Sequence, residues 1–347
     1  MKILVTGSGG QLGRTIMNSS RYMEHEFIFT SHAGERPAAC PEGASWACLD
    51  ITDRESVRRI VAENEAEIII NCAGYTDVAG AEKEPQKAFL INSEAVSYLA
   101  QAARETGAML MHISTDYVFD GYASTPYRED DPASPLSEYG RSKLEGEKAV
   151  LASGCRYMIF RTAWLFSPYG KNFVRTIMMK ADAQSSISVV SDQIGTPTYA
   201  SDLVEAIFHI VDEGMLDKEG IYNFTDEGVC SWYDFAKEIC AETGSLCVVS
   251  PCSTNDYPTN VRRPQYSVLD KRRFKETFGR DIPHWRDSLS FCIKEIEKFG
   301  LILICHYICR LFVPERASSL FLNIKRIIIC HLQTFSRKSS AQKPTET

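Results

Sequence analysis

Short apolar runs alternate with amphipathic stretches through the first half of the chain. Five apolar, β-rich runs lie near residues 3–6, 26–30, 68–71, 108–113 and 156–161. Runs of this length and composition predict buried strands. Between them, the spacing predicts a helix from Pro85 to Thr106 and another that Asp53 caps and that ends at Asn64. Strands alternating with helices predict a Rossmann-type α/β fold, a doubly wound parallel sheet with helices on both faces.

A glycine-rich turn follows the first strand directly. Gly7, Gly10 and Gly13 have the spacing G-x-x-G-x-x-G and enclose Gln11 and Leu12. Glycines permit a tight turn and close backbone approach, and the next helix presents free N–H groups and its positive dipole end to a pyrophosphate. An ordinary tight turn is the alternative, but the position straight after the first strand favours nucleotide binding.

The residues after the second strand bear on the choice of dinucleotide. In NAD-preferring folds, an Asp or Glu at this place accepts a hydrogen bond from the ribose 2′-hydroxyl. No carboxylate stands at this strand end, where Ser31, His32 and Arg36 lie close together in the sequence. A guanidinium or imidazole suits a 2′-phosphate, which favours NADPH. NADH stays the alternative, because the nearby carboxylate of Glu35 could accept a hydrogen bond from a ribose 2′-hydroxyl.

A tyrosine and a lysine lie four residues apart in the segment SEYGRSKLEGEKAV, residues 137–150. Positions i and i+4 share one face of an α-helix, so Tyr139 and Lys143 can share one site. The lysine charge is expected to lower the pKa of Tyr139, which makes the phenol a usable proton donor near neutrality. A solvated helix face is the alternative for the bare pattern. Thr115, at a predicted strand end, favours catalysis, although it could instead cap a backbone group.

Composition and charge limit the kinds of molecule that the protein is expected to bind. The formal charge is −7, of which residues 299–347 carry +5, so residues 1–298 carry −12. An acidic body argues against nucleic acid as the partner, and local donors must hold any anionic ligand. The cysteines have no Cys-x-x-Cys pair, and the N-terminal apolar run is too short for a secretory signal. Reduced thiols and a cytoplasmic location are therefore expected.

Motifs in both halves carry a family resemblance. They are GSGGQLG (7–13), NCAGYTDV (71–78), STDYVFDG (114–121), YGRSKLEGE (139–147), DQIGTPTYASDL (192–203), GIYNFTDEGVCSWYDFAKEI (220–239) and RRPQYSVLDK (262–271). With these the chain resembles the extended short-chain dehydrogenase/reductase superfamily and, within it, the dTDP-4-dehydrorhamnose reductases. The resemblance covers about residues 1–298. The second-half motifs are the specific ones, since sugar epimerases and dehydratases share only the first-half pattern.

The resemblance implies NADPH-dependent reduction of dTDP-4-dehydrorhamnose to dTDP-L-rhamnose. It implies that Tyr139 protonates the developing alkoxide, that Lys143 lowers the pKa of Tyr139 and holds the nicotinamide ribose, and that Thr115 hydrogen-bonds the substrate oxygen. The cofactor-binding residues implied are Gly7, Gly10, Gln11, Leu12, Gly13, Ser31, Arg36, Asp50, Ile51, Ala73, Gly74, Tyr139 and Lys143. The substrate-binding residues implied are Tyr75, Thr76, Tyr117, Trp164, Asn172 and Arg263.

The second half is expected to hold the sugar nucleotide. Trp164 suits the face of a sugar or base, with a plain core tryptophan as the alternative. Asn172 offers an amide to the diphosphate, and Arg262 and Arg263 offer guanidinium forks, with a solvated surface pair as the alternative. A stripe with helical spacing is predicted to be core: Trp232, Phe235, Ala236 and Ile239.

We expect three parts in the chain. Residues 1–160 form an NAD(P)-binding Rossmann domain, residues 161–298 a smaller C-terminal α/β substrate-binding domain partly interleaved with it, and residues 299–347 an atypical tail. The apolar run Leu301–Val313 is too short and too polar to span a membrane. A membrane-surface segment is one interpretation of the tail. A non-native extension, such as a shifted reading frame, is favoured.

Metal use, assembly and activity have alternatives. Some similar proteins hold Mg²⁺ at a dimer interface through glutamates, one of them early in the first helix, where this chain has Thr15. No metal ligand is therefore assigned, and Mg²⁺ dependence and the choice between monomer and homodimer stay open. The alternative activities are reduction of another 4-keto sugar nucleotide and a non-catalytic NADP-binding regulatory role resembling the methionine adenosyltransferase β-subunit. Retention of Thr115, Tyr139 and Lys143 favours the enzyme.

Overall fold

The computed structural model describes residues 1–19, 24–32, 36–37, 39–256 and 261–312, with side chains described up to Lys298. Backbone contacts divide the chain into two compact units, Met1–Ile293 and Lys294–Thr347. Every helix and strand before the last helix belongs to the first unit.

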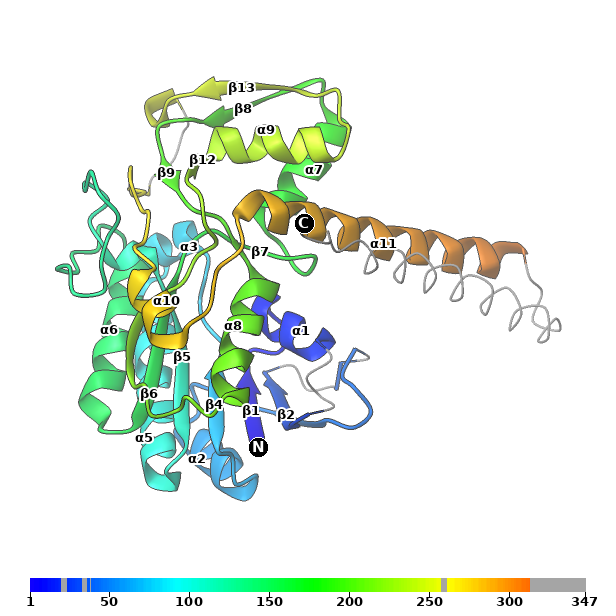
Figure 1. Cartoon of the computed structure of the whole chain (residues 1–347). Helices are drawn as coiled ribbons and strands as arrows, with labels where there is room; N and C mark the ends of the chain where they lie inside the picture. The colour runs from blue at the N-terminus through cyan, green and yellow to red at the C-terminus, as the bar shows by residue number, and fades with distance from the viewer. Residues whose placement is uncertain (20–23, 33–35, 38, 257–260, 313–347) are drawn as a thin grey trace, which may run out of the picture. The chain divides into compact units, whose positions relative to one another are not determined.

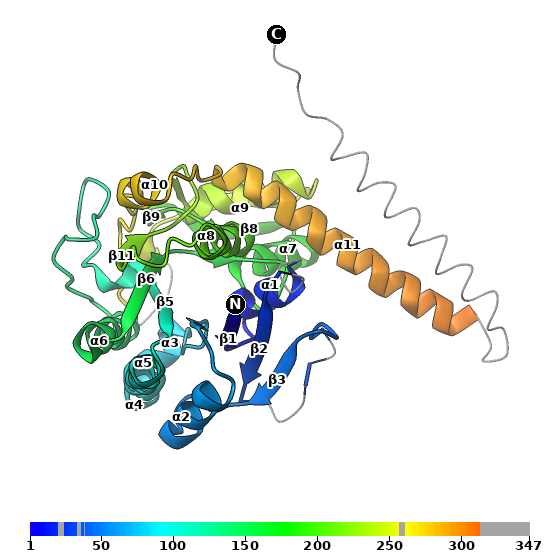
Figure 2. The ribbon, with the colours of Figure 1, turned by 60° about the horizontal axis from the view of Figure 1, so that its bottom comes forward.

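A seven-stranded parallel sheet forms the centre of the first unit (Figures 1 and 2). In spatial order its strands are β3 (Ser45–Cys48), β2 (Glu26–Ser31), β1 (Lys2–Thr6), β4 (Ile68–Asn71), β5 (Met109–Thr115), β6 (Arg156–Thr162) and β11 (Gly220–Asn223). The five predicted strands and the doubly wound Rossmann-type fold are confirmed, and β3 and β11 were not predicted. The strand order reverses between β1 and β4, so the carboxyl ends of these strands border the crevice where such sheets bind ligands.

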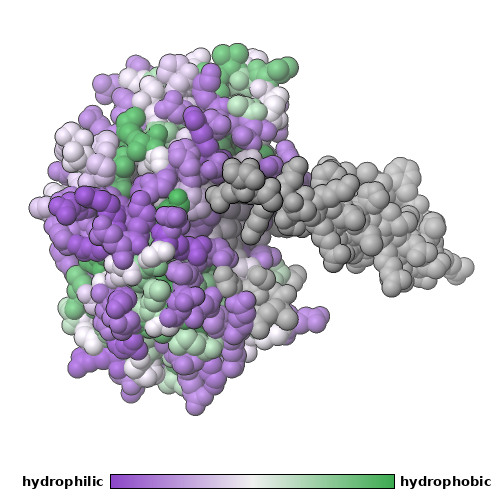
Figure 3. Space-filling model, viewed as in Figure 1, coloured by the Kyte–Doolittle hydropathy of each residue, from purple (hydrophilic) through white to green (hydrophobic). Residues whose placement is uncertain are grey.

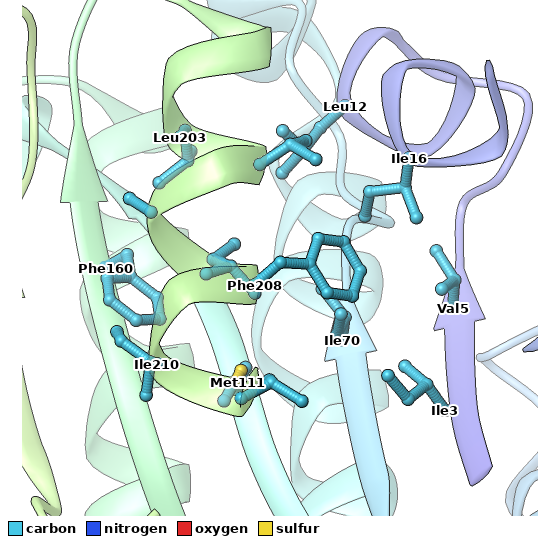
Figure 4. Close-up of a cluster of buried hydrophobic side chains, with 14 of the residues drawn as sticks. Ile3, Val5, Leu12, Ile16, Ile70, Met111, Phe160, Leu203, Phe208 and Ile210 are labelled. Carbon is cyan, nitrogen blue, oxygen red and sulfur yellow. The ribbon is translucent and has the colours of Figure 1, made fainter. Parts of the chain in front are cut away.

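Helices cover both faces of the sheet (Figure 2). One face carries α1 (Gln11–Asn18), α8 (Ala200–Asp212) and α10 (Arg272–Phe278), and the other carries α2 (Arg54–Glu63), α5 (Ala95–Thr106) and α6 (Glu138–Ser153). Side chains alternate along β1: Ile3 and Val5 pack with Phe208 of α8 in one core, while Leu4 packs with Leu99 of α5 in the other. Figure 4 shows the first core, in which Phe208 lies among side chains from α1, β1 and β4.

Two local predictions have different outcomes. Asp53 caps α2 as expected, since its side chain accepts hydrogen bonds from the backbone N–H groups of Glu55 and Ser56. The helix predicted from Pro85 to Thr106 is not one regular helix. It consists of α4 (Pro85–Phe89), a π-helical turn (Leu90–Glu94) and α5, and it follows α3 (Val78–Lys83). A π-turn inserts one extra residue and changes which side chains face inward.

The second half adds three small sheets to the large one (Figure 1). The pairs are β7 (Leu165–Phe166) with β10 (Thr198–Tyr199), β9 (Ile194–Gly195) with β12 (Cys230–Ser231), and β8 (Ser186–Val190) with β13 (Val248–Cys252). Two helices pack beside them, α7 (Phe173–Ala183) and α9 (Trp232–Glu242). The predicted core stripe is buried at Phe235, Ala236 and Ile239, while Trp232 is half-buried.

The last helix, α11, runs from Trp285 to Phe312, beyond the expected closing helix that ended at Lys298. Its buried side chains are Trp285, Ser288, Leu289, Cys292 and Ile293. Residues 313–347 lie outside the described residues, and with them most of the tail. Among the helices of the described part, none is both long and apolar enough to cross a membrane. Figure 3 shows hydrophilic residues over most of the viewed face, with hydrophobic residues in scattered groups.

Candidate active site

The three predicted catalytic residues come together at the carboxyl end of β5. Thr115 is the last residue of that strand, and Tyr139 and Lys143 lie on the first turns of α6. Ser137 caps this helix by accepting a hydrogen bond from the Gly140 N–H. The Thr115 hydroxyl hydrogen-bonds the Tyr139 phenol. Thr115 and Lys143 are each 5% exposed and Tyr139 is half-buried, so the three predicted catalytic residues are largely shielded from water.

Close backbone packing holds α6 in this place. A Cβ atom on Gly140 would lie 2.2 Å from the carbonyl oxygen of Tyr117. Tyr117 follows Thr115 by two residues in a short 3₁₀ turn, η3 (Asp116–Val118). The missing side chain therefore lets the start of α6 approach the end of β5, which brings Tyr139 to Thr115.

Lys143 is held in a fixed position by the backbone. Its Nζ donates to the Ile113 carbonyl oxygen at 2.6 Å. Burial lowers the pKa of Lys143 to about 8, and the nearby negative charge of Glu147 opposes that change. An ammonium in this place is therefore close to losing its proton at mildly alkaline pH.

The tyrosine differs from the expectation drawn from the sequence. Lys143 was expected to lower the pKa of Tyr139, but burial raises that pKa and the opposing influence is the hydrogen bond from Thr115. Asp116 and Tyr117 raise it further. The i,i+4 spacing places both residues on one face, but in this structure the ammonium of Lys143 turns to the Ile113 carbonyl oxygen.

A buried ion pair lies one helical turn beyond Lys143. Arg161 of β6 donates to both carboxylate oxygens of Glu147, at 3.0 and 2.7 Å. Ser114, the residue before Thr115, donates to the same carboxylate. Arg161 also donates to the Glu129 carbonyl oxygen at 3.0 Å. Glu147 is 1% exposed, so this carboxylate is the local counter-charge for two buried cations.

The glycine turn after β1 has the shape of a dinucleotide cradle. Gly7 has φ +63°, and a Cβ there would lie 2.6 Å from the Ala73 backbone nitrogen, so β1 and the loop after β4 meet without a side chain between them. The turn closes with a hydrogen bond from Gly10 N–H to the Gly7 carbonyl oxygen, and α1 starts at Gln11. The buried hydroxyls of Ser8 and Ser31 have no hydrogen-bond partner in the described part of the chain. These residues fit a phosphate-containing dinucleotide.

The other predicted cofactor residues have identifiable contacts. Arg36 donates to the carbonyl oxygens of Pro41 and Ala44, and Asp50 accepts from both the backbone and the hydroxyl of Thr52. Leu12 and Ile51 are buried apolar side chains. Arg36 and Asp50 are exposed. Their predicted contacts with a dinucleotide stay predictions.

The loop after β4 contains four predicted residues, Ala73, Gly74, Tyr75 and Thr76. Asn92, from the π-turn, accepts from the Tyr75 N–H at 2.8 Å and donates to the Tyr75 carbonyl oxygen at 3.0 Å. The same amide donates to the Ser142 hydroxyl of α6 at 2.9 Å. Asn92 thus ties the loop to the catalytic helix. Nothing in its sequence context predicts this role beyond one amide in the stretch AFLINSEAV.

Several aromatic side chains and one arginine lie where the second half of the chain meets the predicted catalytic residues. Tyr117 meets Tyr139 edge-on with ring centroids 5.5 Å apart, and Arg263 hydrogen-bonds the Tyr117 hydroxyl. Trp164 has φ +47° and stacks on Trp232 with ring centroids 3.5 Å apart. Both tryptophans are half-buried. Tyr117 and Arg263 therefore lie beside the predicted catalytic residues, while Trp164 belongs to a separate aromatic stack with Trp232.

Asn172 is already engaged within the protein. Its side chain caps α7 by accepting from the Arg175 N–H, and its amide donates to Gln11 Oε1 at 3.1 Å and to the Ser167 carbonyl oxygen at 2.8 Å. It is 8% exposed. The hydrogen bond to Gln11 links the glycine turn to the start of α7, and the predicted substrate contact of Asn172 stays a prediction.

Comparison with known proteins places this site in a family. The family model described as the RmlD substrate binding domain matches residues 1–298. The chain belongs to the RmlD substrate-binding-domain family. The dTDP-4-dehydrorhamnose reductase of Aggregatibacter actinomycetemcomitans is 38% identical over 301 residues, which cover 83% of this chain and 97% of the relative.

Solved structures of two further relatives have the same fold. The dTDP-4-dehydrorhamnose reductase of Clostridium acetobutylicum is 39% identical, with a TM-score of 0.78, and the match covers 86% of this chain and 100% of that one. The Bacillus anthracis dTDP-4-dehydrorhamnose reductase, in complex with NADP, is 33% identical, with a TM-score of 0.76 and coverage of 85% and 99%. The resemblance seen in the motifs is therefore confirmed over nearly the whole length of these relatives.

Among the described residues of this RmlD-family chain, one group of possible metal ligands lies away from the predicted catalytic residues. Glu24, His25 and Asp212 have ligand atoms within 4.8 Å of one another, and His25 Nε2 lies 2.8 Å from Asp212 Oδ1. His25 immediately precedes β2, so this group lies at the amino ends of the strands, opposite the site. Thr15 is 6% exposed and donates to the Gln11 carbonyl oxygen. Mg²⁺ dependence stays untested.

Proposed function

We propose that this RmlD-family chain reduces dTDP-4-dehydrorhamnose to dTDP-L-rhamnose with NADPH. The observation that carries the proposal is the match of residues 1–298 to the family, together with Thr115, Tyr139 and Lys143 at the carboxyl edge of the sheet beside the glycine turn. The relatives' names favour this activity over a non-catalytic regulatory role.

The catalytic residues divide the work of reduction. When bound, a reduced nicotinamide supplies the hydride that reduces the keto carbon. Tyr139 donates its phenolic proton to the keto oxygen, so that the carbonyl group becomes a hydroxyl. Thr115 donates a hydrogen bond to the same oxygen as negative charge develops there. Lys143 would hold the nicotinamide ribose once the cofactor is bound; in the structure its ammonium donates to the Ile113 carbonyl oxygen and does not lower the pKa of Tyr139.

The preference for NADPH is part of the proposal. It rests on Ser31 and Arg36 near the end of β2, where a carboxylate would otherwise repel a 2′-phosphate, and on the NADP complex of the Bacillus anthracis relative. The unpartnered Ser31 hydroxyl is available to a phosphate oxygen. The ratio of kcat/KM for NADPH and NADH tests this preference, and equal values for the two cofactors contradict it.

We also propose how the chain is divided. Residues 1–160 supply the cofactor side and the catalytic triad, and residues 161–298 mainly supply the substrate side, through Trp164, Asn172 and Arg263. In the structure, β11 pairs with β6 and α8 packs on α1, so the second half also completes the Rossmann sheet. We propose that the enzyme works in the cytoplasm as a monomer or homodimer on a dTDP-sugar, without nucleic acid.

The deciding experiment measures NADPH oxidation with dTDP-4-dehydrorhamnose for the wild type, Tyr139→Phe and Tyr98→Phe. Tyr139→Phe removes the proton donor, and we expect kcat to fall by about 10²- to 10⁴-fold. Tyr98 donates to Glu94 on the surface of α5, so its loss should leave kcat unchanged.

Each outcome bears on a different part of the proposal. No oxidation by the wild type contradicts the proposed reaction, and turnover of other 4-keto sugar nucleotides at higher kcat/KM would redirect it to the alternative substrate. Unchanged turnover in Tyr139→Phe contradicts the role of Tyr139 alone.

A further inference from the structure

A second carboxyl group lies inside the catalytic set, and the mechanism above does not use it. Asp116 follows Thr115 directly and is 2% exposed. Its Oδ1 lies 3.0 Å from the Thr115 hydroxyl oxygen. Its Oδ2 is buried without a hydrogen-bond partner in the described part of the chain. A buried carboxylate oxygen without a donor is unfavourable, which favours the protonated acid.

The surroundings of Asp116 act on its ionisation in opposite directions, and burial, which favours the neutral form, has the largest effect. The titratable groups that face it are the phenols of Tyr117 on the same turn and Tyr139 on α6. Hydrogen bonds from the hydroxyls of Ser267 and Thr115 favour the carboxylate, and Arg263 hydrogen-bonds the hydroxyl of the neighbouring Tyr117. No described cation pairs with the carboxyl group, and burial raises the pKa of Asp116 to about 6.

The proton on the Asp116 carboxyl group determines which way the hydrogen bond between Asp116 and Thr115 runs. A threonine hydroxyl has one hydrogen to donate and two lone pairs to accept with. One lone pair accepts from the Tyr117 N–H at 3.2 Å. An ionised Asp116 can only accept, so it takes the single hydrogen of Thr115. A protonated Asp116 instead donates to the second lone pair, and the hydrogen of Thr115 is then free to point at Tyr139 and at the substrate oxygen.

We propose that Asp116, in its protonated form, is a positioning residue that orients the Thr115 hydroxyl so that Thr115 donates toward Tyr139 and the keto oxygen. The proposal rests on the proposed reductase activity, because it assigns a role in that reaction. Asp116 itself exchanges no proton with the substrate. It donates a hydrogen bond to the second lone pair of the Thr115 hydroxyl oxygen.

Two substitutions separate this role from a structural one. In Asp116→Asn the amide nitrogen donates to Thr115 at every pH, as the protonated acid does. In Asp116→Leu the donor is lost and the branching of the side chain is kept, although leucine is larger. We expect Asp116→Leu to lower kcat on the order of 100-fold, the cost of one misdirected donor to a developing oxyanion. Asp116→Asn should keep kcat at low pH within a few-fold of the wild-type value.

The pH profile provides a readout that a structural role would not change. Wild-type kcat should decline as the pH rises through the titration of Asp116, and Asp116→Asn should lack that limb while keeping the limb due to Lys143. The matched control is Asp226→Asn, since Asp226 is a fully buried carboxyl that accepts from the Tyr199 N–H away from Thr115. This control should keep both limbs.

A double-mutant cycle tests whether Asp116 acts through Thr115. In a Thr115→Val background, Asp116→Leu should cause no further loss of kcat, whereas a general packing defect would cost the same in both backgrounds. An equal loss in both, or a wild-type pH limb in Asp116→Asn, overturns the inference while the reductase activity stands. An inactive wild type overturns both.

Discussion

At the scale of single residues, buried charge governs this site. Lys143 is a cation in an apolar environment, and its proton is retained because Glu147 lies one turn away on the same face of α6. Glu147 is in turn compensated by Arg161 and by the hydroxyl of Ser114. The motif YGRSKLEGE contains this glutamate four residues after Lys143. The role of Glu147 was not predicted because its partner, Arg161, comes from another element, the strand β6.

Removing the charge of Glu147 should change the pH dependence of the reaction. Glu147 raises the pKa of Lys143, so in Glu147→Gln that pKa falls below its value of about 8. The charged ammonium is then lost at a lower pH, and the alkaline limb of kcat/KM should move down by about one pH unit or more. Glu145→Gln is the matched control, because Glu145 is 45% exposed and pairs with Lys148 on the surface.

The stability of this variant needs its own check. Glu147→Gln leaves Arg161 buried without its counter-charge, which costs about 3–5 kcal/mol. Glu147→Gln combined with Arg161→Met removes the uncompensated cation and should recover part of that loss in the free energy of unfolding. An alkaline limb at the wild-type pH in both folded variants contradicts the role given to Glu147.

At the scale of elements, the periodicity of the sequence predicts most strands and helices but not how they touch. The strands β1, β2, β4, β5 and β6 follow from their apolar runs. The π-turn at Leu90–Glu94 does not follow, because it is stabilised by the contacts of Asn92 with Tyr75 and Ser142, which are distant in sequence. The short strand β3 was also missed, since its four residues are either half-buried or exposed.

The approach of α6 to η3 leads to a prediction at this scale. Gly140→Ala places a methyl group 2.2 Å from the Tyr117 carbonyl oxygen, so the helix or the turn must move. We expect a loss of about 1–3 kcal/mol in the free energy of unfolding, together with a lower kcat because Tyr139 shifts from Thr115. Gly43→Ala is the control, because a Cβ there meets nothing within 4 Å. Equal stability and kcat for the two variants would show that this contact does not position Tyr139.

At the scale of the whole molecule, the second half does more than cover the substrate. β11 extends the sheet beside β6, and Phe208 of α8 fills the core over β1. In contrast, the buried side chains of α11 end at Ile293 in the part where side chains are described. The family match also ends at residue 298, and every predicted site residue precedes that point.

Deletion of residues 299–347 should therefore leave the enzyme active. We expect kcat/KM within about twofold of the full-length value, an unchanged melting temperature and a higher soluble yield, since the apolar run at 301–313 is removed. Steady-state kinetics and thermal unfolding of the truncated and full-length chains check this. Deletion of residues 285–347 is the destabilised reference, because it also removes Trp285 and Leu289 from the core. If deletion of residues 299–347 is by itself enough to abolish turnover, the tail has a function.

The sequence by itself determines the fold class, the glycine turn and the family, and it predicts the three catalytic residues. These follow from local spacing: apolar runs of strand length, glycines after a strand, and residues four apart on one helix. Only the tertiary structure decides the protonation of the site. The pKa values of Lys143, Tyr139 and Asp116 depend on burial and on partners such as Glu147 and Thr115 that folding brings near. Desolvation is a property of the packed molecule, so no motif could show that Tyr139 would be less acidic than expected or that the Asp116 carboxyl would be buried without a counter-charge among the described residues.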